Sequence, residues 1–351
     1  MGLKKKDLSL ALLALFPGLS AVTAASAIVA YQAIFPRYER PNYSLLAGEY
    51  LYDRIADRLS RREIIYQPHD YKLKGYFYES SGGAGTVILR HGIHAGADDY
   101  LPLTEQLVLR GYSVFTYDAT GTYESEGEST VGMCQAIIDL EATVKYLRTQ
   151  DEFKNEPFYF LGHSWGAYAV TAALNVCEGI RACAAVSGMN NGVNMISDKV
   201  REYVKLGSVV DFPETVFRVY QKLLFGRYVD YDAVSGINKA NIPTLIAHGV
   251  DDRVILLDSQ SIASHASELK NGSVEYYIGK GLNGEHDSIW HSSAAVAYQL
   301  ELASEERLLE MKKRSKLTDA ERAEFYSTVD HRLYSEVNGE LLDKIISTFK
   351  S

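Results

Sequence analysis

The fold predicted for this chain depends on the stretch F-Y-F-L-G-H-S-W-G at residues 158–166. Its first four residues are apolar, and an alanine-rich stretch with helical spacing follows at 167–176. A strand, a sharp turn and a helix form the setting in which the serine of a G-x-S-x-G motif stands exposed as a nucleophile. Glycine at both ends of the motif permits the close backbone approach that this turn requires. The pattern alone also fits an ordinary strand-to-helix connection, so the neighbouring motifs decide between the two interpretations.

Two predicted strands upstream end in polar turns. Residues 86–89 are continuously apolar, as in a strand buried on both faces, and lead into Arg90-His91-Gly92. Residues 113–117 lead into the turn D-A-T-G-T-Y-E-S-E-G at 118–127. The other predicted elements are a hairpin of 63–67 with 73–78, a surface helix at 43–61, a helix at 133–147, and strands at 180–186, 242–247 and 273–278.

Two later turns supply a carboxylate and an imidazole. The strand at 242–247 ends in H-G-V-D-D-R-V, residues 248–254, and the last strand is followed by the glycine-rich loop G-K-G-L-N-G-E-H-D, residues 279–287. These turns place Asp252 and then His286 after the serine, the order Ser, acid, His of one hydrolase fold. Asp251 is the alternative acid, and solvated loop aspartates are the simpler interpretation of the pair. We expect His265 and His291 to be surface or core residues.

These four turns, in this order, resemble the α/β-hydrolase superfamily over about residues 60–310. The turn at 118–127 is similar to D-x-x-G-x-(G/Y)-x-S-x-G in the serine aminopeptidase-like and monoacylglycerol-lipase-like branch, where it braces the nucleophile turn and is not catalytic. The resemblance implies an α/β fold with a mostly parallel central sheet flanked by helices. It also implies Ser164 as nucleophile, His286 as base and Asp252 as the orienting acid.

The chemistry implied is covalent acyl transfer. His286 takes the proton of the Ser164 hydroxyl, while Asp252 fixes the imidazole and stabilises its charged form. The resemblance assigns the oxyanion hole to the backbone N–H groups of Ile93 and Trp165, since a developing oxyanion needs fixed donors. Neither a cofactor nor a metal is expected. His91 is predicted to be structural, and a metal pair with His94 lacks a third ligand nearby.

The connection at 188–241 is longer than an ordinary crossover and predicts a helical cap above the serine. Residues 196–206 and 213–225 have helical spacing with apolar faces. Several of its residues are candidates for an apolar acyl pocket, although packing of the cap onto the sheet explains each of them equally well: Met189, Met195, Phe212, Phe217, Tyr220 and Leu224.

Composition excludes several other classes of protein. A formal net charge of −9 provides no basic surface for nucleic acid. Three cysteines without a C-x-x-C motif give no redox or metal signature. Cys177 and Cys183 would pair only in an oxidising compartment, and small buried side chains are the favoured interpretation for all three.

The N-terminus predicts a single transmembrane anchor. Lys4-Lys5-Lys6 precedes an apolar stretch, residues 8–35, that carries no charge and would reach roughly 40 Å as a helix, against a hydrocarbon core of about 30 Å. The basic cluster favours a cytoplasmic N-terminus and an extracytoplasmic catalytic domain, although Arg37 and Arg40 on the other flank oppose this. The alternative is a signal peptide cleaved near Ala25-Ser26-Ala27, giving a secreted protein. A buried helix of a soluble protein is the third interpretation.

The predicted organisation therefore has seven parts. They are a basic start (1–7), the anchor (8–35), a linker and helix (36–62), the core (63–187), the cap (188–241), the rest of the core (242–310) and a C-terminal helical extension (311–351). Within this extension we expect a partner-binding or packing role, and we expect the helix at 294–309 to cover the final strand.

The function expected is that of a membrane-anchored serine hydrolase that cleaves carboxylic esters with an apolar acyl or aryl group. A small-molecule or lipid-like ester is the expected substrate, and protein partners are not indicated. The enzymatic alternatives are a serine aminopeptidase-like peptidase and an acyl-thioesterase. A catalytically silent hydrolase fold that acts as an anchored binding protein is the alternative from another class.

Overall fold

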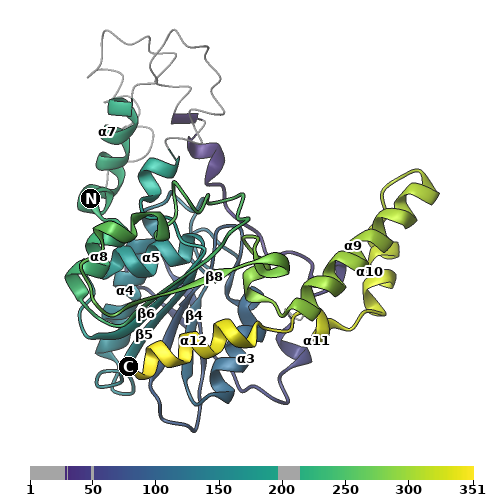
Figure 1. Cartoon of the computed structure of the whole chain (residues 1–351), viewed down its shortest axis with the longest axis horizontal. Helices are drawn as coiled ribbons and strands as arrows, with labels where there is room; N and C mark the ends of the chain where they lie inside the picture. The colour runs from purple at the N-terminus through teal and green to yellow at the C-terminus, as the bar shows by residue number, and fades with distance from the viewer. Residues whose placement is uncertain (1–27, 30, 49–50, 197–213) are drawn as a thin grey trace.

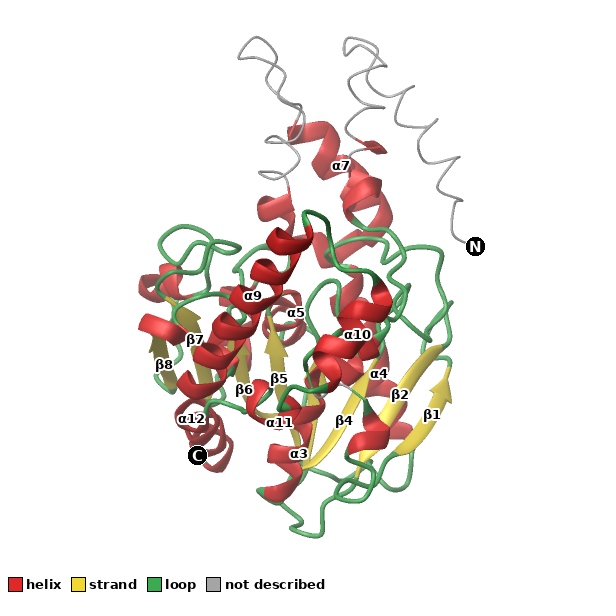
Figure 2. Cartoon of the chain, turned by 90° about the vertical axis from the view of Figure 1, so that its right-hand side faces the viewer, coloured by secondary structure: helices red, strands yellow, loops and turns green. Residues whose placement is uncertain are grey.

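The computed structural model describes residues 28–29, 31–48, 51–196 and 214–351, without the side chains of 214–217. Eight strands form one sheet in the order β1-β2-β4-β3-β5-β6-β7-β8. The pairs β1·β2 and β2·β4 are antiparallel, and all other neighbouring pairs are parallel. Figure 2 shows this sheet crossing the domain with helices on both faces. The strands are β1 Arg62–Tyr66, β2 Leu73–Tyr78, β3 Thr86–Arg90, β4 Ser113–Tyr117, β5 Phe158–His163, β6 Ile180–Val186, β7 Thr244–Gly249 and β8 Val274–Gly279.

Each predicted strand is present within two residues of its expected bounds. In the hairpin, Arg62 pairs with Phe77 and Tyr66 with Leu73. Strands β3 and β5 are buried along their whole length because helices cover both faces. The predicted α/β architecture with a mostly parallel sheet is therefore confirmed.

Helices cover the sheet as two layers. On one face α4 contacts α5 and α5 contacts α8, while α5 also packs on β3, β5 and β6. On the other face α3 packs on β4, and α12 packs on β6, β7 and β8. The α-helices are α3 Leu101–Leu109, α4 Gln135–Thr149, α5 Trp165–Ala173, α7 Glu214–Phe225, α8 Ala233–Ala240, α9 Ser293–Lys313, α10 Asp319–Ser327, α11 His331–Tyr334 and α12 Gly339–Lys350.

The final helix has the packing role that was one of the two expected for the C-terminal extension. Helix α12 is no addition beyond the fold, because Leu341, Ile345 and Phe349 are buried in one of the two cores. Phe349 lies 5.0 Å from the ring of Tyr159 and 5.7 Å from that of Tyr112. The last twelve helical residues thus close the layer that residues 294–309 were predicted to close.

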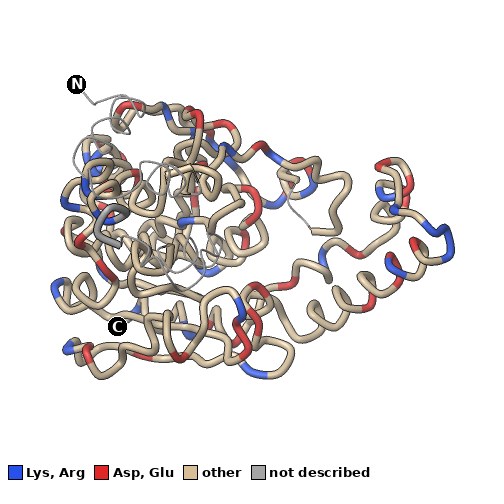
Figure 3. Tube along the Cα trace, turned by 90° about the horizontal axis from the view of Figure 1, so that it is seen from above, with Lys and Arg blue, Asp and Glu red and all other residues tan. Residues whose placement is uncertain are grey.

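Helices α9, α10 and α11 instead form an arm, residues 293–338, between the loop after β8 and α12. Figure 1 shows α9 and α10 side by side, projecting from the body of the domain. Arg322 of α10 pairs with Glu306 of α9 at 3.0 Å, and blue and red positions are interspersed along the arm in Figure 3. At the base of the arm, the backbones of His291 and Val337 form an isolated antiparallel β-bridge. The carbonyl of Ala47 accepts a hydrogen bond from His331 at 2.6 Å. The predicted cover of the final strand is therefore wrong, since most of α9 is exposed and points away from the sheet.

The end of the predicted transmembrane segment lies within the folded domain. Most of the segment, residues 8–27, falls outside the described residues, but Ile28, Tyr31 and Phe35 are all buried. The ring of Tyr31 lies 4.9 Å from Phe35 and 5.7 Å from Tyr220 of α7. The predicted outer boundary at residue 35 is thus wrong, because these side chains pack against protein.

A glycine makes room for this contact. A Cβ at Gly132 would lie 1.6 Å from the Tyr31 hydroxyl, and Gly132 has a φ of +156°.

Within the described part of the chain, no helix has both the length and the apolar character needed to cross a bilayer.

The segment predicted as one surface helix at 43–61 forms short turns. Tyr43–Leu45 and Tyr52–Arg54 are single 3₁₀ turns, designated η1 and η2. Of the apolar positions that suggested a helix, Ile55 and Leu59 are buried, and Leu45, Leu46 and Leu51 are partly exposed. Side-chain contacts fix the turns, since Tyr52 donates to the carbonyl of Leu59 at 2.7 Å. The predicted helix at 213–225 is present as α7, whereas 197–213 lies outside the described residues. All three cysteines are free and buried.

Candidate functional site

The predicted nucleophile lies at a strained turn between β5 and α5. Ser164 has φ +56° and ψ −117°, a conformation that a non-glycine residue adopts only when its surroundings enforce it. A Cβ at Gly162 would lie 2.3 Å from the Gly166 carbonyl oxygen, and one at Gly166 would lie 2.1 Å from the Arg90 carbonyl oxygen. Both glycines are therefore required for the close approach of the strand, the turn and β3. The prediction from the sequence is correct on this point.

The predicted base and acid are hydrogen-bonded to each other. Nδ1 of His286 lies 2.7 Å from Oδ2 of Asp252, and both residues are buried. A carboxylate only accepts, so Nδ1 carries the proton and Nε2 presents its lone pair. Oδ1 of Asp252 accepts the backbone N–H groups of Val254 and Ile255, each at 2.8 Å. Asp252 thus holds the imidazole in the tautomer that a general base needs.

The surroundings of Asp252 keep it ionised. Burial raises its pKa, but hydrogen bonds from His248 and His286 outweigh this and hold the pKa well below its ordinary value. His248, fully buried, lies with Nε2 3.2 Å from Oδ2 of Asp252 and also donates to the carbonyl of Ile255. The alternative acid, Asp251, is exposed, and it is Asp252 that contacts His286.

The turn after β3 reaches the nucleophile. A Cβ at Gly92 would lie 3.4 Å from Cβ of Ser164, so Gly92 and its neighbour Ile93 border the serine. The N–H of Trp165 is the first of α5 and has no acceptor within the helix. This is the arrangement expected of the two predicted oxyanion donors. His91 contacts only backbone, with Nδ1 donating to Gly92 and Nε2 accepting from Ala119.

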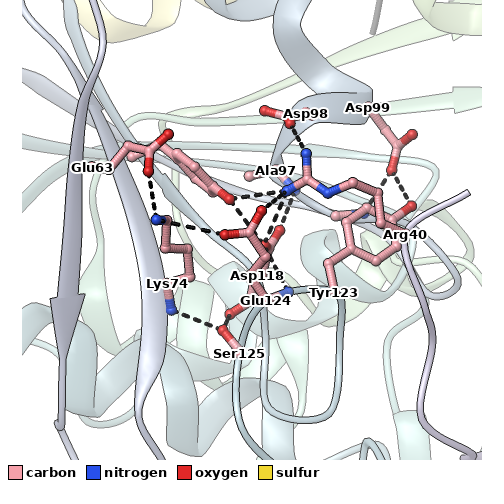
Figure 4. A network of polar contacts seen from close by, with 12 residues as sticks. Arg40, Glu63, Lys74, Ala97, Asp98, Asp99, Asp118, Tyr123, Glu124 and Ser125 are labelled. Atoms are coloured by element: carbon pink, nitrogen blue, oxygen red, sulfur yellow. Dashed lines mark hydrogen bonds and ion pairs between the residues drawn. The ribbon is translucent and has the colours of Figure 1, made fainter. Parts of the chain in front are cut away.

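A network of charged side chains supports the turn after β3. Asp118, the first residue of the 118–127 turn, accepts the N–H of Ala97 at 2.9 Å, and Tyr123 donates to Asp99 at 2.7 Å (Figure 4). Arg40 lies between the carboxylates of Asp98, Asp118 and Glu124 in the same view. The 118–127 turn therefore braces the oxyanion-side loop, whereas the resemblance implied a brace on the nucleophile turn.

The residues predicted to form an acyl pocket are largely packed into protein. Met189 and Tyr220 are 3% and 1% exposed and belong to the main hydrophobic core. Met195 and Leu224 are partly buried against that core. The side chain of Phe217 and all of Phe212 lie outside the described residues.

A cavity of about 340 Å³ lies on another side of the site. Its wall includes Ala95 from the loop after β3, His163 from the end of β5 and Asp287 from the loop after β8. The arm supplies the opposite wall through Gln299 and Tyr334, among others. The sequence did not indicate this cavity, because it forms only where the arm returns to the body.

One group of side chains has the spacing of a metal site. Ligand atoms of His163, His286 and Asp287 lie within 4.8 Å of one another. Nε2 of His163 is nevertheless a hydrogen-bond donor to the carbonyl of His286 at 3.2 Å, and a donor nitrogen carries no free lone pair. These residues fit a hydrogen-bonded arrangement better than a metal ligand set.

Comparison with known families agrees with this geometry. A family model described as serine aminopeptidase, S33, matches residues 83–223, which include the candidate nucleophile and both oxyanion loops. Over this part the chain is similar to that family, and its fold is that of the α/β-hydrolases. The superfamily named from the four turns of the sequence is thereby confirmed.

Relatives of this α/β-hydrolase are distant. The uncharacterized protein YfhR of Salmonella typhi is 26% identical over 203 residues, which are 58% of this chain and 66% of that protein, slightly under two thirds. An esterase from Pyrococcus furiosus has a TM-score of 0.53 at 21% identity, covering 81% of this chain and 100% of that one. Est1E of Butyrivibrio proteoclasticus, with bound ferulic acid, has a TM-score of 0.50 at 19% identity, covering 68% and 98%. At these identities the two structures show a shared fold.

Proposed function

We propose that this α/β-hydrolase is a serine hydrolase acting on carboxylic esters, with Ser164 as nucleophile, His286 as base and Asp252 as acid. The proposal is carried by the 2.7 Å hydrogen bond from His286 to a buried, ionised Asp252, together with the strained backbone of Ser164 at the turn between β5 and α5. The backbone N–H groups of Ile93 and Trp165 are the proposed oxyanion donors. The structural likeness to an esterase is consistent with this choice of substrate.

The reaction would proceed in two halves. The Ser164 oxygen attacks the ester carbonyl while its proton passes to Nε2 of His286, and the oxyanion accepts the two N–H groups. The intermediate then expels the alcohol, which takes that proton, and leaves an acyl group on Ser164. Water, deprotonated by the same nitrogen, attacks the acyl-enzyme and releases the carboxylic acid.

A fluorophosphonate probe tests the nucleophile directly. Folded wild-type protein should be labelled once, and S164A should not be labelled. Failure of the wild-type protein to react would favour a silent fold that only binds its ligand. Equal labelling of S164A would show that the probe reacts at another residue and would reject Ser164 as the nucleophile.

Peptide bonds are the second candidate substrate, because the matching family model is described as a serine aminopeptidase. Rates on p-nitrophenyl esters and on aminoacyl-nitroanilides, measured side by side, separate the two activities. Faster turnover of the anilides would replace the esterase assignment.

We propose further that residues 8–27 anchor the enzyme in a membrane, with the catalytic domain outside the cytoplasm. Twenty uncharged residues span about 30 Å as a helix, which matches a hydrocarbon core. Alkaline extraction of membranes tests this, since an anchored protein remains in the pellet. Release into the medium of a chain that begins near Ile28 would instead support signal-peptide cleavage.

A further inference from the structure

We infer that His163 is a positioning residue that fixes the oxyanion loop, the nucleophile turn and the base loop relative to one another. The inference rests on the proposed function, because it concerns how the groups of that reaction are held. The observation behind it is a continuous chain of hydrogen bonds through both nitrogens of one imidazole, next to the nucleophile in sequence.

The chain begins at the oxyanion loop. Gly92 donates its N–H to the hydroxyl of Tyr100 at 3.1 Å, and that hydroxyl lies 2.8 Å from Nδ1 of His163. On the other side of the ring, Nε2 of His163 lies 3.2 Å from the carbonyl oxygen of His286. The three contacts join residues 92, 163 and 286, each of which is a proposed catalytic residue or the neighbour of one.

The direction of each bond follows from chemistry. A carbonyl oxygen only accepts, so Nε2 of His163 must carry a proton. In the neutral ring Nδ1 is then an acceptor, and Tyr100 donates to it while accepting from Gly92. Every polar atom in the chain is satisfied in this one arrangement, so the tautomer of His163 is fixed.

The ring remains neutral in its site. Burial and, to a lesser extent, the neighbouring His286 imidazole lower the pKa of His163 to about 4, against the opposing effect of Asp287. The two imidazole centroids are 5.0 Å apart. A neutral His163 leaves the proposed base free to become the single positive charge in the site during the reaction.

His163 affects the position of the reacting groups more than the binding of substrate. The carbonyl held by His163 belongs to His286 itself, and Ser187 donates to the same oxygen at 3.1 Å. Loss of the His163 bond removes one of the two hydrogen bonds to the His286 carbonyl, while loss of the Tyr100 bond disconnects the loop next to Ile93 from the nucleophile turn. Displacement of reacting groups by about 1 Å can lower a rate about 10²-fold without weakening substrate binding.

Four substitutions separate the two parts of this hydrogen-bond series, the link from His163 to Tyr100 and the link from His163 to His286. H163F removes both bonds and approximately preserves ring volume. H163Q places an amide donor where Nε2 stands and keeps the link to His286, whereas H163N places an acceptor where Nδ1 stands and keeps the link to Tyr100. Y100F removes the hydroxyl that joins His163 to Gly92 of the oxyanion loop. The measurements are kcat and KM on p-nitrophenyl butyrate and the thermal unfolding temperature of the full chain.

We expect H163F to lower kcat about 10²-fold with KM nearly unchanged. Y100F should be at least as slow as H163Q, because it also removes the hydrogen bond from Gly92, and the double variant Y100F/H163Q should be no slower than Y100F. Y100F/H163N should be as slow as H163F. A merely structural role would lower the unfolding temperature without this pattern in kcat.

Two results would overturn the inference: a kcat of H163F close to that of the wild type, or multiplicative losses in Y100F/H163Q. If H163F does not fold, the Y100F and H163Q cycle decides. The wild-type protein is first labelled with the fluorophosphonate. If it is not labelled, the proposed function fails; if it is labelled, the variants test the role of His163 alone.

Discussion

Replacing Tyr31 with alanine should destabilise the hydrolase domain by about 3–5 kcal/mol, the usual cost of truncating a large buried aromatic side chain. The side chain is 0% exposed and packs against Phe35, Tyr220 and the backbone of Gly132. The matched control is V29A on the same stretch, where the side chain is 64% exposed and the expected change is within about 0.5 kcal/mol.

The assay is thermal unfolding of the full chain in detergent micelles, followed by fluorescence of the buried Trp165 and Trp290. For a domain of this size, about 2–4 °C per kcal/mol gives a drop of roughly 6–20 °C for Y31A. The reasoning would be refuted if Y31A and V29A unfolded within about 2 °C of each other. That result would mean that residues 28–35 do not belong to the folded core and would restore the longer membrane segment.

Other substitutions test the site and its support. D252N should lower kcat about 10³- to 10⁴-fold with KM little changed in ester hydrolysis, because the His286 tautomer is lost; a loss under tenfold would argue for another acid. G121A should cost several kcal/mol in urea unfolding, since its Cβ would lie 2.2 Å from the Ser129 carbonyl at a φ of +68°. G83A, at φ +64° with open space, should cost only about 1–2 kcal/mol, and equal losses would show that conformation alone is responsible. Burial raises the pKa of Asp118 to about 7, so its contribution to stability is full below its unfolded value of 3.8 and is lost as pH rises through about 7. Wild-type stability relative to D118N should therefore fall between about pH 4 and about pH 7, and a constant difference would contradict the raised pKa.

The sheet and the order of the three proposed catalytic residues were predictable because they depend on local patterns. Buried parallel strands are continuously apolar. The turns after β3, β4, β5, β7 and β8 carry glycine and polar residues in patterns that can be recognised in the sequence. The hydrogen bond between His286 and Asp252 follows from that order, since parallel strands bring their carboxyl ends to one edge of the sheet.

Contacts between distant segments were not predictable in this way. Apolar spacing in residues 28–35 indicates burial but does not distinguish lipid from protein, and only the contact with Tyr220 and Gly132 decides it. Helices α9 and α12 are similarly ambiguous, because both have apolar positions and only one faces the sheet. The role of His163 was missed because its partners, Tyr100 and the His286 carbonyl, are far apart in sequence, although its place beside the serine was visible.

The arm has a further consequence for how this chain tolerates change. It leaves and rejoins the body at adjacent points: Ser292 donates to the Glu336 carbonyl at 2.8 Å, and Asn338 donates to the Trp290 carbonyl at 2.7 Å. A short turn could therefore replace the forty-odd residues between these points while β8 and α12 keep their places. The segments after β8 and before α12 are thus held together at the base of the arm whatever its length, while α10 packs on η1 farther out.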